Sequence, residues 1–373
     1  MKFIAFILAV LGLIASNANA QLICYEGFNY TPGTKLNGIG TGTGWAAAWV
    51  TAPAFVTANK DNATAVTSLK PGGLAFTGQR LQTVGNDVRS FRRIDTTAGS
   101  GAAAAGLVNA NGKIGVPNGI VWVSYMAALS SGNNTNTGNG GFHLYDGLGD
   151  LNAFTDGDKG HHEILFLGDR NNPTTGINWC VEVTSGGSGT VDSTVPVNTT
   201  PHLFVWKLEM FAGRNGRVTL YIDPAIGAAS ATLTPTFVTN VVTGSNVQTQ
   251  FQFDYVEIGS ANSNGASPYQ ERLDIDEFRI GATYASVTPA VALPAPVLPP
   301  PVKQSNGAML LNWQTTDGFR YAIDYSGDLS LWSPAITPTL ASGNPMSWTD
   351  DGSVTGTTPS LAMRRFYRLY VQE

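Results

Sequence analysis

Apolar and polar residues alternate with a period of two in many short segments of the chain. In residues 202–211 (HLFVWKLEMF), Phe204, Trp206 and Leu208 fall on one face and the residues between them on the other. This period is typical of a β-strand with one buried face. Similar or continuously apolar segments predict further strands at 119–128, 163–167, 177–184, 217–222, 251–258 and 273–280.

Clusters of turn-forming residues separate these segments. Two examples are residues 131–141 (SGNNTNTGNGG) and 185–190 (SGGSGT). Helical periodicity over more than two turns is absent, although residues 98–108 are compatible with a short helical turn. Many short strands joined by turns are typical of a sandwich or barrel, so the predicted fold class is all-β.

A proline-rich segment divides the chain into two parts. Pro289 to Val302 (PAVALPAPVLPPPV) contains six prolines and predicts an extended linker. We therefore expect a large domain over 21–288 and a small one over 303–373. The small domain has its own strand patterns, at 308–313, 320–326, 346–350 and 364–371.

The first twenty residues have the pattern of a secretory signal peptide. Lys2 precedes the apolar run from Phe3 to Ile14, and Ala18-Asn19-Ala20 matches a cleavage site. The apolar run is too short for a membrane span. We expect a secreted, extracellular or cell-surface protein without a transmembrane segment once the signal is removed.

Composition narrows the function classes. Of 373 residues only 13% are charged, and 43 are Gly, while the net charge is −5. Coiled coils and helical bundles need more Ala, Glu, Lys and Leu, and disordered chains have fewer apolar residues. Without a basic stripe, nucleic acid is excluded as an expected partner.

Two stretches of the large region resemble a known family. Residues 25–30 (YEGFNY), followed by Gly42 to Trp45 and by Trp49, are similar to the opening of many secreted bacterial proteins, and residues 276–284 (DEFRIGATY) are similar to their close. Those proteins belong to the concanavalin A-like lectin/glucanase superfamily, the laminin-G-like jelly rolls. The resemblance implies a large antiparallel jelly-roll sandwich, often carbohydrate-binding, whose first and last strands pair.

The small region carries a second resemblance. The spacing of Tyr321, Ile323, Tyr325 and Trp332, with the closing residues 366–369 (FYRL), resembles a fibronectin-III-like module at the C-termini of secreted bacterial proteins. The resemblance implies a small β-sandwich with a binding or spacing role.

A glycosidase of this superfamily carries a strand of the pattern E-x-D-x-E, which places its carboxylates on one face. In the nearest match here, Glu163 occupies the first position, but Leu165 and Leu167 occupy the others. Asp274 and Asp276 are a second possible carboxylate pair, because they share a face of their strand. They lie, however, in the strand that carries the closing pattern of the family. We therefore assign no catalytic residue, and enzymatic activity is less expected than binding.

Aromatic and polar side chains are the candidate ligand contacts, because sugars stack on rings and hydrogen-bond to polar groups. The predicted ligand-binding residues are Trp45, Trp49, Trp179, His143 and Tyr145. For each of the three tryptophans, the alternative role is packing in the core. Two other tryptophans lie in apolar strands and are predicted to be core, namely Trp122 and Trp206.

Four aspartates crowd a loop rich in Gly: Asp146, Asp150, Asp156 and Asp158. Carboxylates on flexible loops suit Ca²⁺, so calcium is the candidate cofactor, although the spacing is not an EF-hand. The alternative is a solvated acidic loop.

Two cysteines follow the signal peptide, Cys24 and Cys180. In an oxidising compartment they form a candidate disulfide, with two buried thiols as the alternative.

These observations favour a secreted, non-catalytic protein that binds a polysaccharide or a cell-surface glycan, or that helps to build the cell surface or matrix. One alternative is a glycoside hydrolase or polysaccharide lyase with an unrecognised site. Another is a structural surface protein that self-associates.

Overall fold

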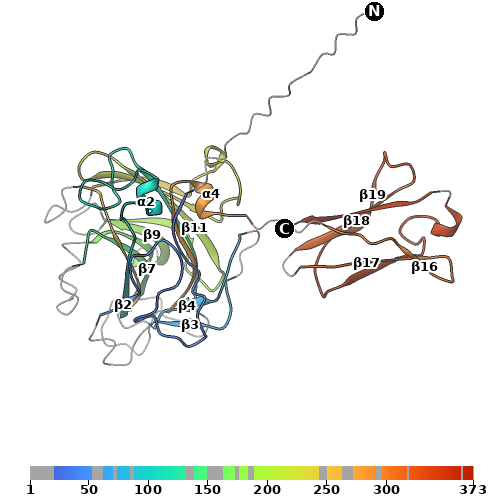
Figure 1. Ribbon diagram of the computed structural model, residues 1–373, viewed down its shortest axis with the longest axis horizontal. Coiled ribbons are helices and arrows are strands. Elements are labelled where there is room, and N and C mark those ends of the chain that lie inside the picture. Colours follow the sequence, from blue (N-terminus) through green and yellow to red (C-terminus); the bar gives the residue numbers. More distant parts are fainter. Residues whose placement is uncertain are drawn as a thin grey trace, which may run out of the picture. The chain divides into compact units, whose positions relative to one another are not determined.

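The computed structural model describes residues 21–52, 62–69, 74–84, 88–130, 138–148, 163–172, 176–183, 189–242, 250–262, 272–290, 296–316, 319–362 and 364–372. The chain divides into two compact units (Figure 1), with the boundary at Pro289/Ala290 and residues 72–75 grouped with the second unit. Both units consist of antiparallel strands, which confirms the predicted all-β fold class. No helix among the described residues is long and apolar enough to cross a membrane.

The large unit contains two antiparallel sheets. The eight-stranded sheet has the order β13-β12-β11-β6-β15-β4-β3, with β1 paired to β15. Its strands are β1 (Leu22–Glu26), β3 (Ala63–Ala65), β4 (Arg80–Gln82), β6 (Ile120–Leu129), β11 (His202–Met210), β12 (Asn215–Ile222), β13 (Phe237–Val242) and β15 (Leu273–Gly281).

The seven-stranded sheet has the order β10-β9-β8-β7-β14-β5-β2. Its strands are β2 (Val50–Thr51), β5 (Val88–Arg93), β7 (Gly138–Tyr145), β8 (Glu163–Asn172), β9 (Gly176–Val183), β10 (Gly189–Pro196) and β14 (Tyr255–Asn262). Among the described residues of this unit, the helical segments are short: α2 (Gly101–Ala104), η1 (Ser230–Thr232) and α4 (Tyr284–Val287).

The core of the large unit lies between the two sheets. Phe142 of β7 packs against Phe278 of β15 and Tyr125 of β6, with ring centroids 4.3 and 4.5 Å apart. Trp206 belongs to this core, as predicted. Trp122 is also buried, but it alternates with the core residues of β6 and therefore lies on the outer face of the eight-stranded sheet.

Strand β15 is central to the eight-stranded sheet. It pairs with β6 along one edge, and β4 and β1 pair with successive parts of it. The pairing of β1 with β15 joins the first and last strands of the unit, as the family resemblance implied. The opening and closing sequence patterns therefore meet in one sheet.

A buried carboxylate organises the opening pattern. Glu26 accepts hydrogen bonds from the Phe28 amide (2.9 Å), the Tyr30 hydroxyl (2.8 Å) and the Trp49 indole (3.1 Å). It also forms a buried ion pair with Arg92 of β5. Since β1 and β5 belong to different sheets, this ion pair connects the two layers.

The closing pattern contains a β-bulge. The register of β15 shifts between Asp276 and Arg279, and Glu277 adopts a left-handed φ of 55°. Its buried carboxylate accepts hydrogen bonds from the Tyr25 hydroxyl (3.0 Å) and the Thr77 amide (2.8 Å), and it pairs with Arg279. The bulge turns Glu277 toward β1, where these contacts offset the cost of the backbone conformation.

Asp276 gives a pH-dependence prediction. Burial raises its pKa to about 8, although Ser68 Oγ (2.6 Å) and the Leu69 amide (2.9 Å) donate to its carboxyl group. Between pH 4 and 8, the carboxyl group of Asp276 therefore holds its proton more tightly in the folded state than in the unfolded state. Its contribution to the unfolding free energy is full at low pH and decreases as the pH rises through this range. We expect Asp276→Asn to flatten the decrease in the unfolding free energy, measured by urea denaturation at several pH values.

The decrease will not vanish, because burial also raises the pKa values of Glu26 and Glu277. Asp95→Asn is the control, since hydrogen bonds from Thr97 lower the pKa of that carboxyl group. An equally steep decrease in wild type and Asp276→Asn contradicts the prediction.

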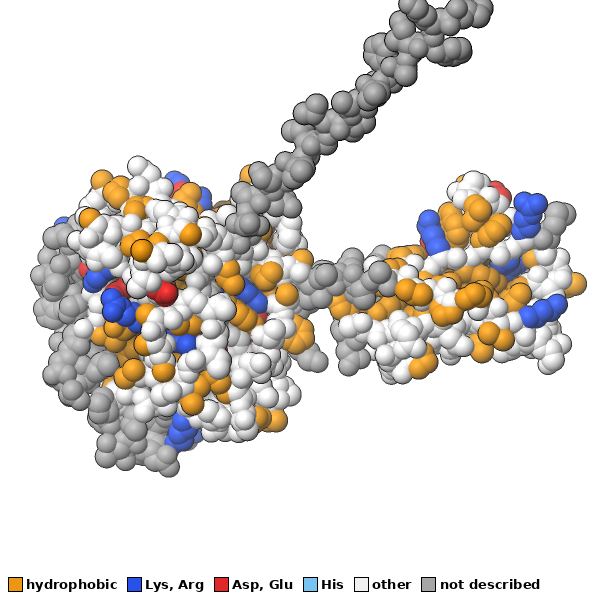
Figure 2. All heavy atoms as spheres, in the orientation of Figure 1, with side chains coloured by type: hydrophobic (Ala, Val, Ile, Leu, Met, Phe, Trp, Pro, Cys, Tyr) orange, Lys and Arg blue, Asp and Glu red, His pale blue; other side chains and the backbone are white. Residues whose placement is uncertain are grey.

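The small unit consists of two three-stranded sheets, with the orders β16-β17-β20 and β19-β18-β21. Its strands are β16 (Val302–Lys303), β17 (Met309–Trp313), β18 (Arg320–Ser326), β19 (Ser333–Leu340), β20 (Met346–Asp350) and β21 (Phe366–Gln372), and a short helix η2 (Pro359–Leu361) precedes β21. The core contains Leu311, Trp313, Phe319, Tyr321, Ile323 and Leu369. Hydrophobic atoms cover much of the face of this unit seen in Figure 2.

Strand β19 was not predicted because it contains Pro334 and Pro338. It pairs with β18 alone and lies at the edge of its sheet. An edge strand tolerates proline, because a proline on its open side removes no ladder hydrogen bond.

Candidate functional site

The seven-stranded sheet has one apolar face and one polar face. Val256 and Ile258 of β14 lie in the core, so Glu257 between them is on the outer face. Glu257 is paired with His143 of β7 and with Phe91 of β5, and residues that pair directly across antiparallel strands share a face. The central strands therefore bring charged and aromatic side chains together on the outer face.

Five side chains on this face form what we call the charged cluster: Arg89, His143, Tyr145, Glu163 and Glu257. Arg89 Nη1 lies 2.9 Å from Glu257 Oε1, and the Tyr145 hydroxyl donates to Glu257 Oε2 over 2.6 Å. His143 Nδ1 is 2.5 Å from Glu163 Oε1, and its Nε2 is 3.8 Å from Glu257 Oε1. The imidazole thus lies between the two carboxylates.

The position of Glu163 corrects a prediction. Simple alternation along the strand put Glu163 on the same face as Leu165 and Leu167. The register between β7 and β8 shifts next to this point, however, and both leucines lie in the core while Glu163 contacts His143 on the outer face. The second carboxylate of the cluster, Glu257, comes from β14 and is not part of the E-x-D-x-E pattern.

The electrostatics of the cluster favour hydrogen bonding over proton transfer. All five side chains are buried, and His143 is the most exposed at 11% of its side-chain area. Burial, together with the negative charges of Glu257 and Glu163, raises the pKa of Tyr145 well above its usual value. Tyr145 therefore remains protonated at neutral pH and acts as a donor.

Aromatic rings and a more exposed arginine border the cluster. Phe91 lies 5.8 Å from Tyr145, and the guanidinium of Arg93 lies over the ring of Tyr255 at 5.7 Å. Phe91, Arg93, Tyr255 and Leu148 line a pocket of about 240 Å³ together with Ala46, Ala47, Ala48 and Val50. Arg93 is 49% exposed and forms an ion pair with Asp254. The partly exposed ring of Tyr255 and the guanidinium of Arg93 thus lie next to the charged cluster, whereas Phe91 is fully buried.

The structure places the predicted ligand-binding residues in two environments. His143 and Tyr145 lie together in the charged cluster. Trp49 and Trp179 have no exposed surface, and Trp45 is half-buried and stacks on Phe278 with centroids 6.0 Å apart. The prediction that Trp49 and Trp179 contact a ligand is wrong, since core packing, the alternative role, covers their ring faces.

Arg89, Glu163 and Glu257 complete the cluster but were missing from the predicted site. The available signal was their charge, because charged residues are scarce in this chain and Glu257 lies between the apolar residues Val256 and Ile258. Their partners come from strands far apart in sequence, so the sequence pattern alone does not pair them.

Of the four predicted calcium ligands, only Asp146 lies among the described residues; Asp150, Asp156 and Asp158 lie outside them. Asp146 forms an ion pair with Lys113 and accepts a hydrogen bond from Gln252 (3.0 Å). A cation at Asp146 would have to compete with Lys113. Within the described part of the chain, no three His, Cys, Asp or Glu residues form a group that could hold a metal ion.

Cys24 and Cys180 do not form the predicted disulfide; both are buried thiols, which was the alternative. Cys24 faces the core from the eight-stranded sheet, whereas Cys180 alternates with core residues of β9 and faces outward from the other sheet. Packed sheets are about 10 Å apart, farther than the Cα–Cα distance of about 6 Å that a disulfide spans. Burial raises the pKa of the Cys24 thiol, as expected for a buried apolar cysteine.

No family model and no curated protein matches the chain. Among solved structures, it is similar to an endo-β-1,4-glucuronan lyase from Trichoderma reesei, with 11% identity and a TM-score of 0.40, covering 72% of this chain and 98% of that one. It is also similar to an alginate lyase in complex with an alginate tetrasaccharide, with 13% identity, a TM-score of 0.37 and coverages of 70% and 96%. A third similar structure is the receptor binding domain of botulinum neurotoxin mosaic serotype C/D, with 10% identity, a TM-score of 0.39 and coverages of 89% and 71%. Similarity at this level assigns neither a family nor a function.

Proposed function

We propose that the large unit is a carbohydrate-binding domain of the concanavalin A-like type, and that it holds a polysaccharide on the outer face of the seven-stranded sheet. The observation that carries this proposal is the charged cluster with its aromatic border. Ion pairs buried on a sheet face are costly to form, and clusters of ionisable groups occur at functional sites.

The chemistry of the cluster fits sugar hydroxyl groups. A sugar hydroxyl both donates and accepts hydrogen bonds. Arg93, with 49% of its side chain exposed, offers donors, and His143, the most exposed member of the cluster, lies beside the carboxylates of Glu163 and Glu257. Tyr255, which lines the neighbouring pocket and is partly exposed, supplies ring surface for a pyranose.

The geometry favours binding without catalysis. A glycosidase needs two carboxyl groups separated by space for the sugar or for water. Here the imidazole of His143 lies between Glu163 and Glu257, and Glu257 also pairs with Arg89. We therefore propose a non-catalytic function.

The test is affinity electrophoresis of the full chain through gels that contain a panel of neutral and acidic polysaccharides. We expect at least one polysaccharide to retard wild type, and His143→Ala and Arg93→Ala to lower its affinity about tenfold, as loss of one charge-assisted hydrogen bond would. Arg93→Ala is a useful partner variant because its exposed position spares the fold. Lys303→Ala, in the small unit, is the control for loss of a positive charge. Unchanged retardation of both His143→Ala and Arg93→Ala contradicts the proposal.

The same gels run with EDTA test the calcium prediction. If Asp146, Asp150, Asp156 and Asp158 hold a calcium ion that supports binding, chelation will release the polysaccharide, and added Ca²⁺ will restore retardation.

A polysaccharide lyase is the second candidate function, because a histidine, a tyrosine and an arginine converge in the cluster. In β-elimination a base removes the proton next to a carboxylate and a C=C bond forms as the bond to the leaving oxygen breaks. The leaving oxygen takes a proton from an acid or from water, and an arginine neutralises the carboxylate. Unsaturated products released from acidic polysaccharides by wild type, and lost in His143→Ala, would replace the non-catalytic proposal.

The proposal also covers the export of the protein, the role of the small unit and self-association. We propose export by the signal peptide at residues 1–20, and a fibronectin-III-like role as a spacer or second binding module for the small unit. Self-association of the surface protein stays a prediction.

A further inference from the structure

A second pocket lies on the outer face of the other sheet. It has a volume of about 450 Å³, within the usual range for small-molecule sites. Its floor comes from three neighbouring strands, β6, β11 and β12, and α4 and η1 contribute to its walls. The lining residues are Ile120, Trp122, Lys207, Tyr221, Ser230, Ala231, Ala282, Thr283 and Tyr284.

Aromatic rings dominate this pocket. Trp122 and Tyr221 are nearly parallel, with centroids 5.9 Å apart and an interplanar angle of 26°. Tyr284 meets Trp122 edge-on at 5.4 Å. Among the described residues, neither the Tyr221 hydroxyl nor the Trp122 indole N–H has a hydrogen-bond partner, whereas the Tyr284 hydroxyl donates to Ala225. Two polar groups of the rings are therefore available to a ligand.

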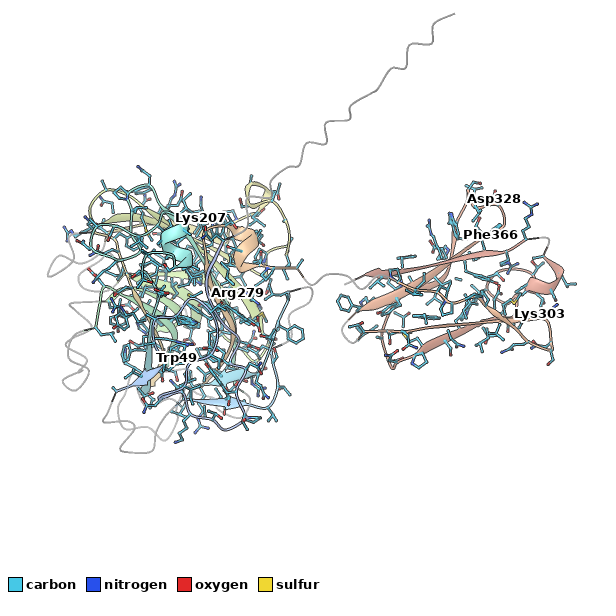
Figure 3. All side chains as sticks on the ribbon, in the orientation of Figure 1. Trp49, Lys207, Arg279, Lys303, Asp328 and Phe366 are labelled. Atoms are coloured by element: carbon cyan, nitrogen blue, oxygen red, sulfur yellow. The ribbon has the colours of Figure 1, made fainter. Side chains whose placement is uncertain are left out.

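A lysine gives the pocket its charge. Lys207, labelled in Figure 3, pairs with Trp122 across the strands, and its ammonium group lies 5.9 Å from the indole ring. It also contacts Glu209 at 3.2 Å, but Arg217 forms two hydrogen bonds to the same carboxylate. Two cations share one anion, so a net positive charge remains beside the rings.

We propose that this pocket is a second ligand site, which binds a sugar ring carrying one acidic group. Trp122 and Tyr221 are 5% and 8% exposed, so the ring edges that border the pocket, with their two polar groups, would contact the sugar, and Lys207 would hold its carboxylate or sulfate. A cationic ligand does not fit, because Lys207 already occupies the position over the indole that such a ligand would take. The inference goes beyond the proposed polysaccharide face and does not depend on it, since the two sites lie on different sheets.

The test uses two sugars that differ only in the acidic group, methyl glucuronide and methyl glucoside. The full chain is labelled with 5-fluorotryptophan, and the Trp122 signal in the fluorine NMR spectrum is assigned with Trp122→Phe. We expect both sugars to shift this signal in a saturable way. The glucuronide should reach half-saturation at a concentration about tenfold lower than the glucoside, because one charge-assisted hydrogen bond contributes about a tenfold difference in affinity.

Two variants sharpen the result. Lys207→Met removes the charge and keeps the length of the side chain, and we expect it to abolish the preference for the glucuronide. Tyr221→Phe should weaken both sugars alike. Lys303→Met is the matched control and should behave as wild type.

The proposal is overturned if the glucuronide produces no saturable shift of the Trp122 signal, or if Lys207→Met keeps the preference. The polysaccharide face is tested separately by Arg93→Ala. If Arg93→Ala abolishes the shift, the signal reports that other face and the second site is likewise overturned.

Discussion

Replacing Arg92 with methionine is expected to lower the unfolding free energy of the large unit by about 3–5 kcal/mol. The change leaves Glu26 buried without its cationic partner. It also removes hydrogen bonds from the guanidinium to the carbonyl groups of Ala47 (2.9 Å) and Thr41 (2.7 Å). The stacking of Arg92 on Trp45, at 4.7 Å, is lost as well. Urea denaturation followed by tryptophan fluorescence measures the effect.

Arg217→Met is the matched control, because Arg217 also pairs with a glutamate but is 42% exposed. A surface pair contributes at most about 1 kcal/mol, so this variant should stay close to wild type. Arg92→Met combined with Glu26→Gln should regain part of the loss, since no buried charge is left unpaired. Equal effects of Arg92→Met and Arg217→Met would show that the connection between the sheets is not important for stability.

Trp313→Ala is expected to unfold the small unit and to leave the large unit folded. Trp313 is fully buried in a core of six residues, and removing a buried tryptophan costs about 3–5 kcal/mol. A single core of this size rarely supplies more than about 3–5 kcal/mol in total. In a calorimetric scan we expect the transition of the small unit to disappear while that of the large unit persists.

Trp332→Ala is the control within the same unit. The indole of Trp332 is only partly buried, lies under the guanidinium of Arg368 at 4.5 Å and donates to the Leu329 carbonyl over 3.2 Å. Its loss should lower the stability by about 1 kcal/mol. If Trp313→Ala also shifts the transition of the large unit, the two units do not unfold independently.

Alternation was sufficient to predict most of the central strands. The pattern of Phe204, Trp206 and Leu208 gave both the strand and its buried face correctly, because β11 has one face in the core and no irregularity. It failed at Glu163, which lies next to a change of register between β7 and β8 that reverses which face the side chain occupies. A bulge adds one residue without altering the apolar or polar character of its neighbours, so composition alone does not reveal it.

The candidate site was less predictable than the fold. His143 and Tyr145 were identified from one segment, but Arg89 and Glu257 come from strands β5 and β14, whose adjacency is a property of the sheet order. The prediction for the tryptophans was wrong for a different reason. An indole has the same sequence signature whether it packs in a core, as Trp49 and Trp179 do, or faces a ligand.

The pairing of β1 with β15 has a consequence for the order of folding. Strand β1 begins at Leu22, and the strand that completes its ladder ends at Gly281. At about 5–20 residues per second, the ribosome adds the second partner roughly 10–50 s after the first. Contacts between such distant segments also slow folding itself. Because β15 is central, the eight-stranded sheet cannot close before this last strand has been synthesised, so the large unit is expected to fold only after translation has passed residue 281.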